Sequence, residues 1–404
     1  MHRVSFGPIL AMVAVVLTTS SATAQLFEAH YLFRGGYPIA ETAWSYRVEG
    51  VAHDNDHWYF TMSRLPATMS FSAVWKVPVG VDLLTVADST PGVTRHSITN
   101  THVLSQYQAF GDGDVYRFNG IDYLVVPLSR GGGCLSQPAS VAFFRCDTLA
   151  FVGVDELPGL PCGAEWIAVN DAGELFTSRD HIGLPTAGQQ GLLVYNVNWA
   201  SLSTPDPLDV TFNREIPLWN ESGQSLELFH MQGGDFTPGD QLLYLSSGYF
   251  DEDNDAADRE GIHVIDTTTY QRVRHSSRGV AGQLFDCYYD PGHDTYEQPQ
   301  GLTLWDLDDG RAPGIKGQLH VLVAEGFFER VDFKHYTRAL TVDRAWSGCQ
   351  TGTPQCPFSS IPAAMIRAWE GSEIRIRAGS YPNPISISQR VRLSSENGTV
   401  RIGG

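Results

Sequence analysis

The sequence predicts an all-β fold, and more specifically a β-propeller with five blades. Three observations indicate it: a unit of short strand-like runs recurs along the chain, aromatic residues are frequent, and helical periodicity is nearly absent from Gln25 to Tyr336. The 404 residues include 40 Gly and 22 Pro, which favour many turns, and 16 Tyr, 20 Phe and 9 Trp, which favour strands. A hydrophobic content of 42% is ample for a buried core.

Five glycines in similar local settings mark the starts of the repeated units. They are Gly50, Gly113, Gly163, Gly233 and Gly301, at intervals of 63, 50, 70 and 68 residues. A second strand-like run follows each glycine, and a third follows in the first four units. Four short strands about every 60 residues are typical of propeller blades with loop insertions, whereas a β-sandwich array would not keep so regular a spacing.

The best-formed unit is Gln300–Ala324, in which the apolar runs Leu302–Leu307 and Leu319–Ala324 flank a loop rich in Asp and Gly. This pattern predicts a β-hairpin with a long connection. The early run Phe27–Phe33 has no unit of its own. We expect it to pair with the last blade and close the ring, because such pairing removes an exposed strand edge.

Residues 1–24 have the features of a secretory signal peptide. Arg3 supplies the charged region, Ile9–Leu17 the apolar region, and Ala22-Thr-Ala24 the small residues before a cleavage site at Gln25. The apolar run is too short to span a membrane. The mature protein is therefore expected to be secreted or periplasmic.

The formal net charge of −18 restricts the partners. So acidic a surface repels nucleic acid phosphates and anionic lipid, which argues against nucleic acid and membrane as partners. It is compatible with cations, with neutral sugars and with the plain solubility of an exported protein. We expect a monomer that binds a small molecule or a carbohydrate.

The six cysteines are an even number in a chain expected to be exported, which predicts structural disulfides. Fifteen pairings are open in principle. Local spacing favours Cys349–Cys356 and Cys134–Cys146, which leaves Cys162 and Cys287 as the third pair. No CxxC spacing occurs, so a cysteine metal site is disfavoured.

The sequence pattern changes after the propeller, which we place at residues 25–338. In the segment 341–404, a disulfide loop leads into an amphipathic helix in which Ile361, Ala364, Met365 and Ala368 share a face, and Gly371 ends the helix. Alternating apolar runs follow at 374–376, 385–387, 391–393 and 400–402.

The motif from Cys356 to Ala364, Cys-Pro-Phe-Ser-Ser-Ile-Pro-Ala-Ala, precedes Gly-Ser-Glu-Ile-Arg-Ile-Arg-Ala-Gly-Ser-Tyr from Gly371 to Tyr381. Together they resemble the N-terminal cap and first coil of the pectin-lyase-like parallel β-helix proteins. The resemblance implies a short helix and a partial right-handed β-helix. A solenoid needs about three or more coils, and this segment has room for one or two. The catalytic and metal-binding residues of the lyases lie on later coils, so the resemblance implies none here.

Ligands of propellers bind at the mouth of the axial channel, near the starts of the inner strands. The polar residues beside the repeat glycines are therefore the candidate ligand-binding residues. We single out Glu49, His53, Asp114, Glu165, Asp235 and Glu297. Converging carboxylates could hold Ca²⁺ or act as a general acid and base pair. Alternatively, these side chains cap backbone groups at turns and strand ends.

The phrase Glu49-Gly-Val-Ala-His-Asp54 resembles the opening of gluconolactonase and strictosidine-synthase-like propellers, in which a metal-binding Glu stands at the position of Glu49. Glu297-Gln-Pro-Gln-Gly-Leu302 resembles the opening of esterase-like phytase propellers, but Gln300 replaces the second Glu of that family. These resemblances imply a Ca²⁺-dependent hydrolase with Glu49 among the metal ligands.

The densest acidic run, from Asp251 to Asp258, places Asp251, Asp253 and Asp255 at alternate positions, as in the first half of a Ca²⁺ loop. Ala256 stands where an EF-hand needs Gly and Ile262 where it needs Glu, so the run is not an EF-hand. It is either a solvated insertion or a Ca²⁺ site of another kind.

No GxSxG, P-loop or GxGxxG motif occurs, so nucleophilic catalysis by Ser or Cys has no support in the sequence. We expect an exported propeller that binds a ligand such as a carbohydrate. One alternative is a Ca²⁺-dependent hydrolase, of the lactonase, phosphoesterase or glycosidase kind, that uses axial carboxylates. Another is a structural or surface protein.

Overall fold

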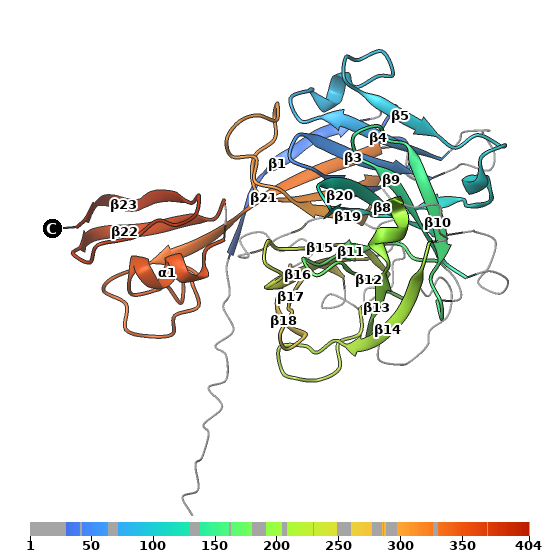
Figure 1. Ribbon diagram of the computed structural model, residues 1–404. Coiled ribbons are helices and arrows are strands. Elements are labelled where there is room, and N and C mark those ends of the chain that lie inside the picture. The colour runs from blue at the N-terminus through green and yellow to red at the C-terminus, as the bar shows by residue number, and fades with distance from the viewer. Residues whose placement is uncertain are drawn as a thin grey trace, which may run out of the picture.

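The computed structural model describes residues 30–40, 43–63, 72–129, 138–160, 163–179, 191–203, 208–228, 230–248, 260–276, 285, 287, 297–325, 330–369 and 371–403. Five β-sheets make up this part of the chain, and we number them blades 1 to 5 in chain order. Figure 1 shows them as a rounded body from which the C-terminal segment extends to one side. No described helix is long and apolar enough to cross a membrane.

Blades 1 to 4 are antiparallel sheets whose strands follow one another outward from the axis. Blade 1 contains β2 (Val48–His53), β3 (His57–Met62), β4 (Ala73–Pro78) and β5 (Thr94–Ser97). Blade 2 contains β6 (Ala109–Phe110) and β7 (Asp114–Phe118), both paired with β8 (Ile121–Ser129), then β9 (Ser140–Arg145) and β10 (Phe151–Glu156). Blade 3 contains β11 (Ala168–Val169), β12 (Glu174–Ser178), β13 (Gly191–Val197) and β14 (Val210–Pro217). Blade 4 contains β15 (Met231–Phe236), β16 (Leu242–Ser247), β17 (Gly261–Asp266) and β18 (Gln271–His275).

Blade 5 joins the two ends of the propeller. It contains β19 (Gln298–Leu304), β20 (Leu319–Glu325) and β21 (Arg330–Val342), so the predicted hairpin of β19 and β20 is confirmed. The early strand β1 (His30–Ala40) pairs antiparallel with β21, from His30 opposite Ala339 to Ala40 opposite Val331. The expectation that an early strand pairs with the last blade is therefore also confirmed.

The hydrophobic core lies between the blades. Five clusters of buried apolar side chains join blades 1 and 2, 2 and 3, 3 and 4, 4 and 5, and finally 5 and 1. The last interface packs Trp58 and Trp75 of blade 1 with Phe333 of blade 5. Each large side chain of this kind stabilises the fold by about 1.5–3 kcal/mol on burial. The closed ring of interfaces confirms the all-β propeller.

The C-terminal segment continues the sheet of blade 5. β21 pairs in parallel with β22 (Glu373–Tyr381), which pairs in parallel with β23 (Arg392–Ile402). The predicted domain boundary between residues 338 and 341 thus falls inside one strand. The alternating run 385–387 is not a strand. The runs 374–376 and 400–402 lie in β22 and β23, and the run 391–393 overlaps the start of β23.

Helix α1 (Ile361–Arg367) connects β21 to β22 on the path of the chain. Ser360 caps its start, because the Ser360 hydroxyl accepts a hydrogen bond from the Ala363 amide. Ile361, Ala364 and Met365 are buried, as the predicted apolar face requires. Three short 3₁₀ turns complete the helical elements of the described chain, at Leu83–Thr85, Val103–Gln106 and Trp199–Ser203.

The disulfide predictions have mixed outcomes. Cys349 and Cys356 form a disulfide, as predicted. Cys146 carries a free thiol, so the predicted Cys134–Cys146 pair is wrong. The reason is that Cys146 packs into the apolar cluster between blades 1 and 2, where burial raises the pKa of its thiol. Cys134 and Cys162 lie outside the described residues, and Cys287 is buried.

Candidate functional site at the propeller axis

Asp112 occupies the centre of the propeller. β6 and β7 both pair with β8, and the inner strand of blade 2 is interrupted between them at Gly111-Asp112-Gly113. A Cβ atom on Gly111 would lie 2.0 Å from the Glu165 carbonyl oxygen, and one on Gly113 would lie 2.4 Å from the Val125 carbonyl oxygen. Only glycine fits these two places, and the interruption leaves Asp112 fully buried.

The Asp112 carboxylate accepts backbone hydrogen bonds from three other blades. Oδ1 accepts from the Val51 amide of blade 1 at 2.8 Å. Oδ2 accepts from the amides of Gly234 in blade 4 and Leu302 in blade 5, both at 3.2 Å. Burial raises the pKa of Asp112 well above its ordinary value, and these three amide hydrogen bonds oppose that shift.

The backbone of Asp112 joins the remaining blade. Its amide donates to the Glu165 carbonyl at 2.8 Å, and its carbonyl accepts from the Ile167 amide at 2.8 Å, both in blade 3. The contact is a parallel bridge between Asp112 and Trp166. One residue of blade 2 therefore holds all five blades together at the axis.

Three of the repeat glycines make room for Asp112. A Cβ on Gly50 would lie 2.5 Å from the Asp112 Cα, one on Gly233 2.8 Å from Oδ2, and one on Gly301 2.2 Å from Oδ1. Gly163 lies elsewhere, because its Cβ would meet the Ser129 side chain instead. The axis is therefore closed at this level by one side chain packed among glycines.

Asp112 divides the six sequence-predicted residues into two groups. Along the chain of their blades, Glu49, Glu165 and Glu297 come before the axial level, and His53, Asp114 and Asp235 come after it. We call the two ends of the axis the start mouth and the end mouth, after the ends of the inner strands. The six residues therefore do not converge on one site.

At the start mouth, four blades place a Glu or a Gln two residues before the amide that contacts Asp112. These residues are Glu49, Glu165, Gln232 and Gln300. All are buried except Glu165, which is partly exposed. These four residues stand at equivalent positions of their blades. The five repeat glycines marked this equivalence only approximately in the sequence.

Burial raises the pKa of Glu49, and the Arg47 guanidinium and the Ser63 hydroxyl oppose this shift. The Arg47 side chain lies 3.7 Å from the Glu49 carboxylate. Nearby on β19, Gln298 is 2% exposed, and its Oε1 has no hydrogen-bond partner in the described part of the chain. The start mouth thus holds one buried polar atom, the Gln298 Oε1, that has no partner among the described residues.

At the end mouth, the carboxylates tie one blade to the next. Asp114 of blade 2 accepts from the Val169 amide of blade 3 at 2.7 Å. Asp235 of blade 4 accepts from the Leu304 amide of blade 5 at 2.7 Å and from the Thr303 hydroxyl at 3.0 Å. For Asp114 and Asp235, the alternative interpretation from the sequence therefore applies, in which the side chain caps backbone groups at a strand end.

Burial raises the pKa of Asp114 to about 7, and the Asp240 carboxylate adds to the shift. The pKa of Asp235 is raised well above its ordinary value by burial and by the charge of Asp114. Like charges that lie close together in a buried place cannot both ionise easily. Both carboxyl groups therefore ionise less readily than an ordinary Asp.

His53 also joins two blades. Its ring stacks on Trp305 with the centroids 4.5 Å apart, and its Nε2 lies 3.0 Å from the Leu304 carbonyl of blade 5. Its Nδ1 lies 2.9 Å from the Asp54 carbonyl. A neutral imidazole has one N–H, so His53 donates to one of these two carbonyls, and its stacking on Trp305 holds the ring at the interface between blades 1 and 5.

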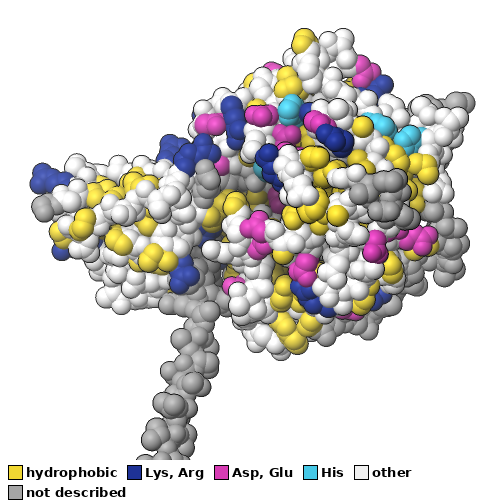
Figure 2. Space-filling model, in the orientation of Figure 1, with side chains coloured by type: hydrophobic (Ala, Val, Ile, Leu, Met, Phe, Trp, Pro, Cys, Tyr) yellow, Lys and Arg dark blue, Asp and Glu magenta, His cyan; other side chains and the backbone are white. Residues whose placement is uncertain are grey.

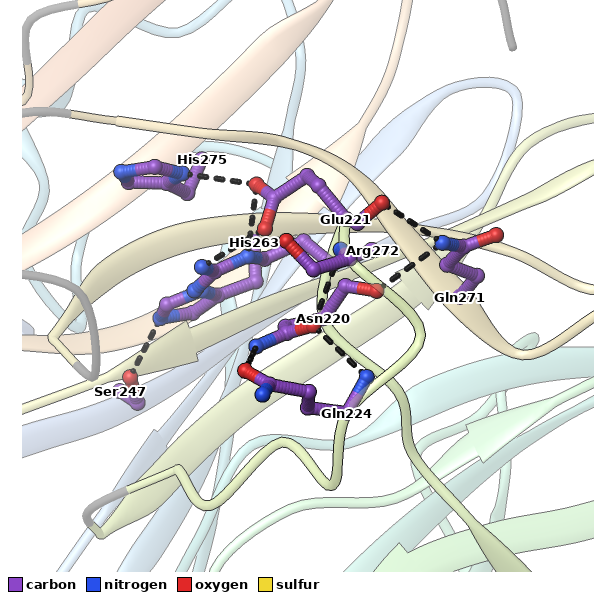
Figure 3. Close-up of polar contacts among 9 residues, drawn as sticks. Asn220, Glu221, Gln224, Ser247, His263, Gln271, Arg272 and His275 are labelled. Atoms are coloured by element: carbon purple, nitrogen blue, oxygen red, sulfur yellow. Dashed lines mark hydrogen bonds and ion pairs between the residues drawn. The ribbon is translucent and has the colours of Figure 1, made fainter. Parts of the chain in front are cut away.

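A polar network near the start mouth was not predicted from the sequence. It runs from Ser247 at the end of β16 through His263 and Arg272 to Glu221 (Figure 3). Arg272 forms two hydrogen bonds of 2.9 Å to the Glu221 carboxylate, and the His275 ring lies 3.0 Å from it. The network fastens the loop after β14 to the outer strand of blade 4.

The Ser247–His263 contact is not a catalytic dyad. Arginine can only donate, so the His263 Nδ1 that lies 3.2 Å from Arg272 accepts a hydrogen bond. The Nε2 of a neutral His263 then carries the proton and donates to the Ser247 hydroxyl at 2.9 Å. A histidine in this state cannot take the serine proton, which agrees with the lack of a nucleophile motif.

No group of three or more His, Cys, Asp or Glu side chains that could hold a metal ion occurs among the described residues. The acidic run with Asp251, Asp253 and Asp255 lies outside them. β16 ends and β17 begins at the start mouth, so both ends of the connection that contains this run are at that mouth. Binding of Ca²⁺ by these residues or by Glu49 stays a prediction.

No protein-family model matches the chain, and no curated protein matches it. Among solved structures, the chain is similar to a GH43_1 enzyme from Xanthomonas citri complexed with xylotriose, with 13% identity, 79% of this chain and 92% of that chain covered, and a TM-score of 0.43. It is similar to the RS223 β-xylosidase, with 13% identity, 78% and 97% coverage, and a TM-score of 0.42. It is also similar to an exo-β-1,3-galactanase from Phanerochaete chrysosporium, with 9% identity, 76% and 64% coverage, and a TM-score of 0.41.

Likeness this distant does not carry an activity from one chain to another. The comparisons do not support the resemblances to gluconolactonase and phytase propellers or to pectin-lyase-like proteins.

Proposed function

We propose that the chain is an exported β-propeller that binds a neutral carbohydrate at the start mouth. The observation that carries this proposal is the Glu or Gln placed at the same position of four blades, Glu49, Glu165, Gln232 and Gln300, above the closed axis. Two carboxylates and two amides offer both acceptors and donors, which suits a ligand rich in hydroxyl groups. The net charge of −18 disfavours an anionic ligand.

The test is calorimetric titration of the full chain with neutral oligosaccharides, xylotriose among them. Glu165→Ala and Gln232→Ala should each weaken binding about tenfold or more, because each removes a polar contact from the mouth. Glu156→Ala is the matched control, since Glu156 is exposed on the outer strand β10, away from the axis. The proposal fails if no sugar binds, or if the control weakens binding as much as the two mouth variants.

Glycoside hydrolysis is the second candidate, and one specific observation favours it. Burial raises the pKa of Glu49, so this carboxyl keeps its proton to a higher pH than an ordinary Glu, as a general acid must. Glu165 is partly exposed at the same mouth and is our candidate for the partner carboxylate.

The test is release of reducing sugar from the oligosaccharide that binds best. Glu49→Gln should reduce hydrolysis at least a hundredfold while binding is retained, because the amide cannot donate a catalytic proton. Equal hydrolysis by Glu49→Gln and the unaltered chain would exclude Glu49 as the acid. A chain that binds sugar and never cleaves it would leave the binding function standing and refute the enzymatic one.

A further inference from the structure

Two buried histidines face each other in blade 5. His320 of β20 and His335 of β21 are directly opposite in the antiparallel ladder, so their side chains share one face of the sheet. His320 is 0% exposed and His335 is 1% exposed, whereas Figure 2 shows other His side chains on the surface of the propeller. The Nδ1 atoms of the two rings lie 2.8 Å apart, which is a hydrogen-bonding distance.

The other nitrogen of each ring contacts a backbone carbonyl. The His320 Nε2 lies 2.7 Å from the carbonyl oxygen of Trp305, just after β19. The His335 Nε2 lies 2.7 Å from the carbonyl oxygen of Tyr37 in β1, the strand that closes the ring. The register of the β1–β21 ladder shifts at this point, so regular strand pairing is interrupted there. The His335 ring therefore supplies a contact between β1 and blade 5 at the interruption.

These three contacts form a chain that needs three protons. A carbonyl oxygen only accepts, so each Nε2 must carry a proton, and the contact between the two Nδ1 atoms needs a further one. Two neutral imidazoles bring only two protons. When both rings are neutral, one of the three contacts therefore lacks its proton.

One added proton completes this chain. His335 then carries a proton on both nitrogens and donates from Nδ1 to the unprotonated Nδ1 of His320, while both Nε2–H groups donate to their carbonyls. A second added proton would place two N–H groups against each other at 2.8 Å, with no acceptor between them. The geometry therefore accommodates one additional proton and excludes a second.

Aromatic side chains surround the two rings. The Trp58 ring of β3 lies 5.3 Å from the His320 ring, and the Phe333 ring of β21 lies 4.7 Å from the His335 ring, measured between centroids. Burial lowers the pKa of His335 to about 4. Burial lowers the pKa of His320 well below its ordinary value, and the charge of a protonated His335 lowers it further. These directions agree with one proton taken up by His335 and none by His320.

The titratable and charged side chains of the neighbouring elements make no hydrogen bond to either ring among the described residues. They are His53 of β2, Tyr37 of β1, Asp82, Asp306 and Arg311 of the adjoining loops, and Asp332 and Lys334 of β21. Asp332 and Lys334 alternate with His335 along β21 and so project from the opposite face of the sheet. The Tyr37 hydroxyl donates to Asp82 at 2.6 Å, and Arg311 lies over the Trp305 ring at 4.8 Å. No carboxylate is therefore in place to stabilise a second proton on the pair.

We propose that His320 and His335 form a one-proton site that makes the closure of the propeller sensitive to acid. The bound proton completes the chain of hydrogen bonds that joins Trp305, β20, β21 and the closing strand β1. The unfolded chain takes up a proton on each ring near pH 6.5, roughly the ordinary pKa of His, whereas the folded chain takes up one, and only in stronger acid. The interface of blade 5 with β1 therefore loses stability as the pH falls below about 6.5. The site does not depend on the proposed carbohydrate function.

The first test is a nitrogen NMR titration of the histidine rings in the full chain, from neutral pH into acid. Signals are assigned by difference from His320→Asn and His335→Asn. The four ring nitrogens of the pair should carry two protons at neutral pH and three below about pH 4, reached in a single step. The proposal is overturned if both rings take up a proton while the chain stays folded, or if neither does before the chain unfolds.

The second test replaces one ring by an amide that cannot titrate. In His335→Asn the amide NH₂ can donate to the His320 Nδ1 at every pH, so the site should bind a proton at least about tenfold more weakly than in the unaltered chain. His102→Asn is the matched control, because His102 is partly exposed and packs against Phe151 of blade 2. Unchanged proton binding in His335→Asn, or an equal loss in His102→Asn, would overturn the proposal.

Hydrogen exchange at neutral pH measures how firmly β1 is held in the same two variants. His335→Asn removes the ring nitrogen that contacts the Tyr37 carbonyl, so the amides of residues 30–40 should exchange about tenfold faster than in His102→Asn. Equal exchange in the two variants would show that the pair does not hold β1 and would refute its part in closing the propeller.

Discussion

The two mouths of the propeller axis contain similar polar residues, but these residues differ in the hydrogen bonds that they make. At the end mouth, the carboxyl oxygens of Asp114 and Asp235 accept hydrogen bonds from backbone amides of the next blade. At the start mouth, among the described residues, Glu49 contacts Arg47 and Ser63 of its own blade, and the Gln298 Oε1 has no hydrogen-bond partner. A polar side chain that completes a neighbouring strand is part of the scaffold, whereas one with hydrogen-bonding capacity left over is available to a ligand.

The strongest test of this comparison is Asp112→Ala, at the boundary between the mouths. The change leaves three buried amides without acceptors, and each unsatisfied group costs about 1–3 kcal/mol. We expect the free energy of unfolding to fall by at least about 3 kcal/mol, measured by urea denaturation. Glu156→Ala, on an exposed outer strand, should change it by less than about 0.5 kcal/mol. A loss below about 1 kcal/mol for Asp112→Ala would show that the axis does not depend on this carboxylate.

The next test sets one mouth against the other. Asp235→Ala removes the acceptor of the Leu304 amide and should destabilise the chain by about 1–3 kcal/mol without changing sugar affinity. Glu165→Ala should do the reverse, with little loss of stability and about tenfold weaker binding. Denaturation and calorimetry on the same two variants measure both quantities. If the two variants lose stability and affinity in equal proportion, the mouths are not distinct.

A pH test addresses the end mouth alone. The folded pKa of Asp114 is raised to about 7, above its ordinary value of 3.8, so the folded chain binds this proton more tightly than the unfolded chain. The stability that this proton provides is fully present below about pH 4 and is lost as the pH rises through about 7. Asp114→Asn cannot titrate, so its unfolding free energy should fall less steeply between pH 4 and pH 7. Parallel pH profiles for the variant and the unaltered chain would mean that Asp114 ionises normally.

The sequence predicted the elements whose signals are local. The recurrence of strand-like runs predicted the propeller, the apolar runs around Asp308 predicted the β19–β20 hairpin, and the seven-residue spacing predicted the Cys349–Cys356 disulfide. The pairing of Cys134 with Cys146 failed because close spacing says nothing about which blade interface a side chain faces.

The candidate residues were predicted to lie near the axis, but their partition between two mouths was not. It depends on the register of one blade against the next, which no single strand encodes. Asp112 stands beside a repeat glycine. The sequence feature that indicates its axial position is the pair of flanking glycines, Gly111 and Gly113. The Ser247–Glu221 network has no local signal, because its members come from β16, β17, β18 and the loop after β14.

The smallest expected effect concerns Glu221, whose network ends at the start mouth. Burial raises the pKa of Glu221, but hydrogen bonds from His275 and Arg272 outweigh burial and lower it to about 2. The stability that the ionised group provides is present above about pH 4.5 and is lost as the pH falls towards about 2.

Glu221→Gln should therefore cost no more than about 1 kcal/mol at pH 7, because the carboxylate is partly exposed and screened by solvent, and the cost should shrink as the pH falls below about 4. Sugar affinity should change less than about threefold, since Glu221 reaches the mouth only through Arg272, His263 and Ser247. Unfolding from pH 2 to pH 7 and one calorimetric titration measure both effects. A tenfold loss of affinity would instead show that the network takes part in ligand binding at the start mouth, with Ser247 as the residue that contacts the sugar.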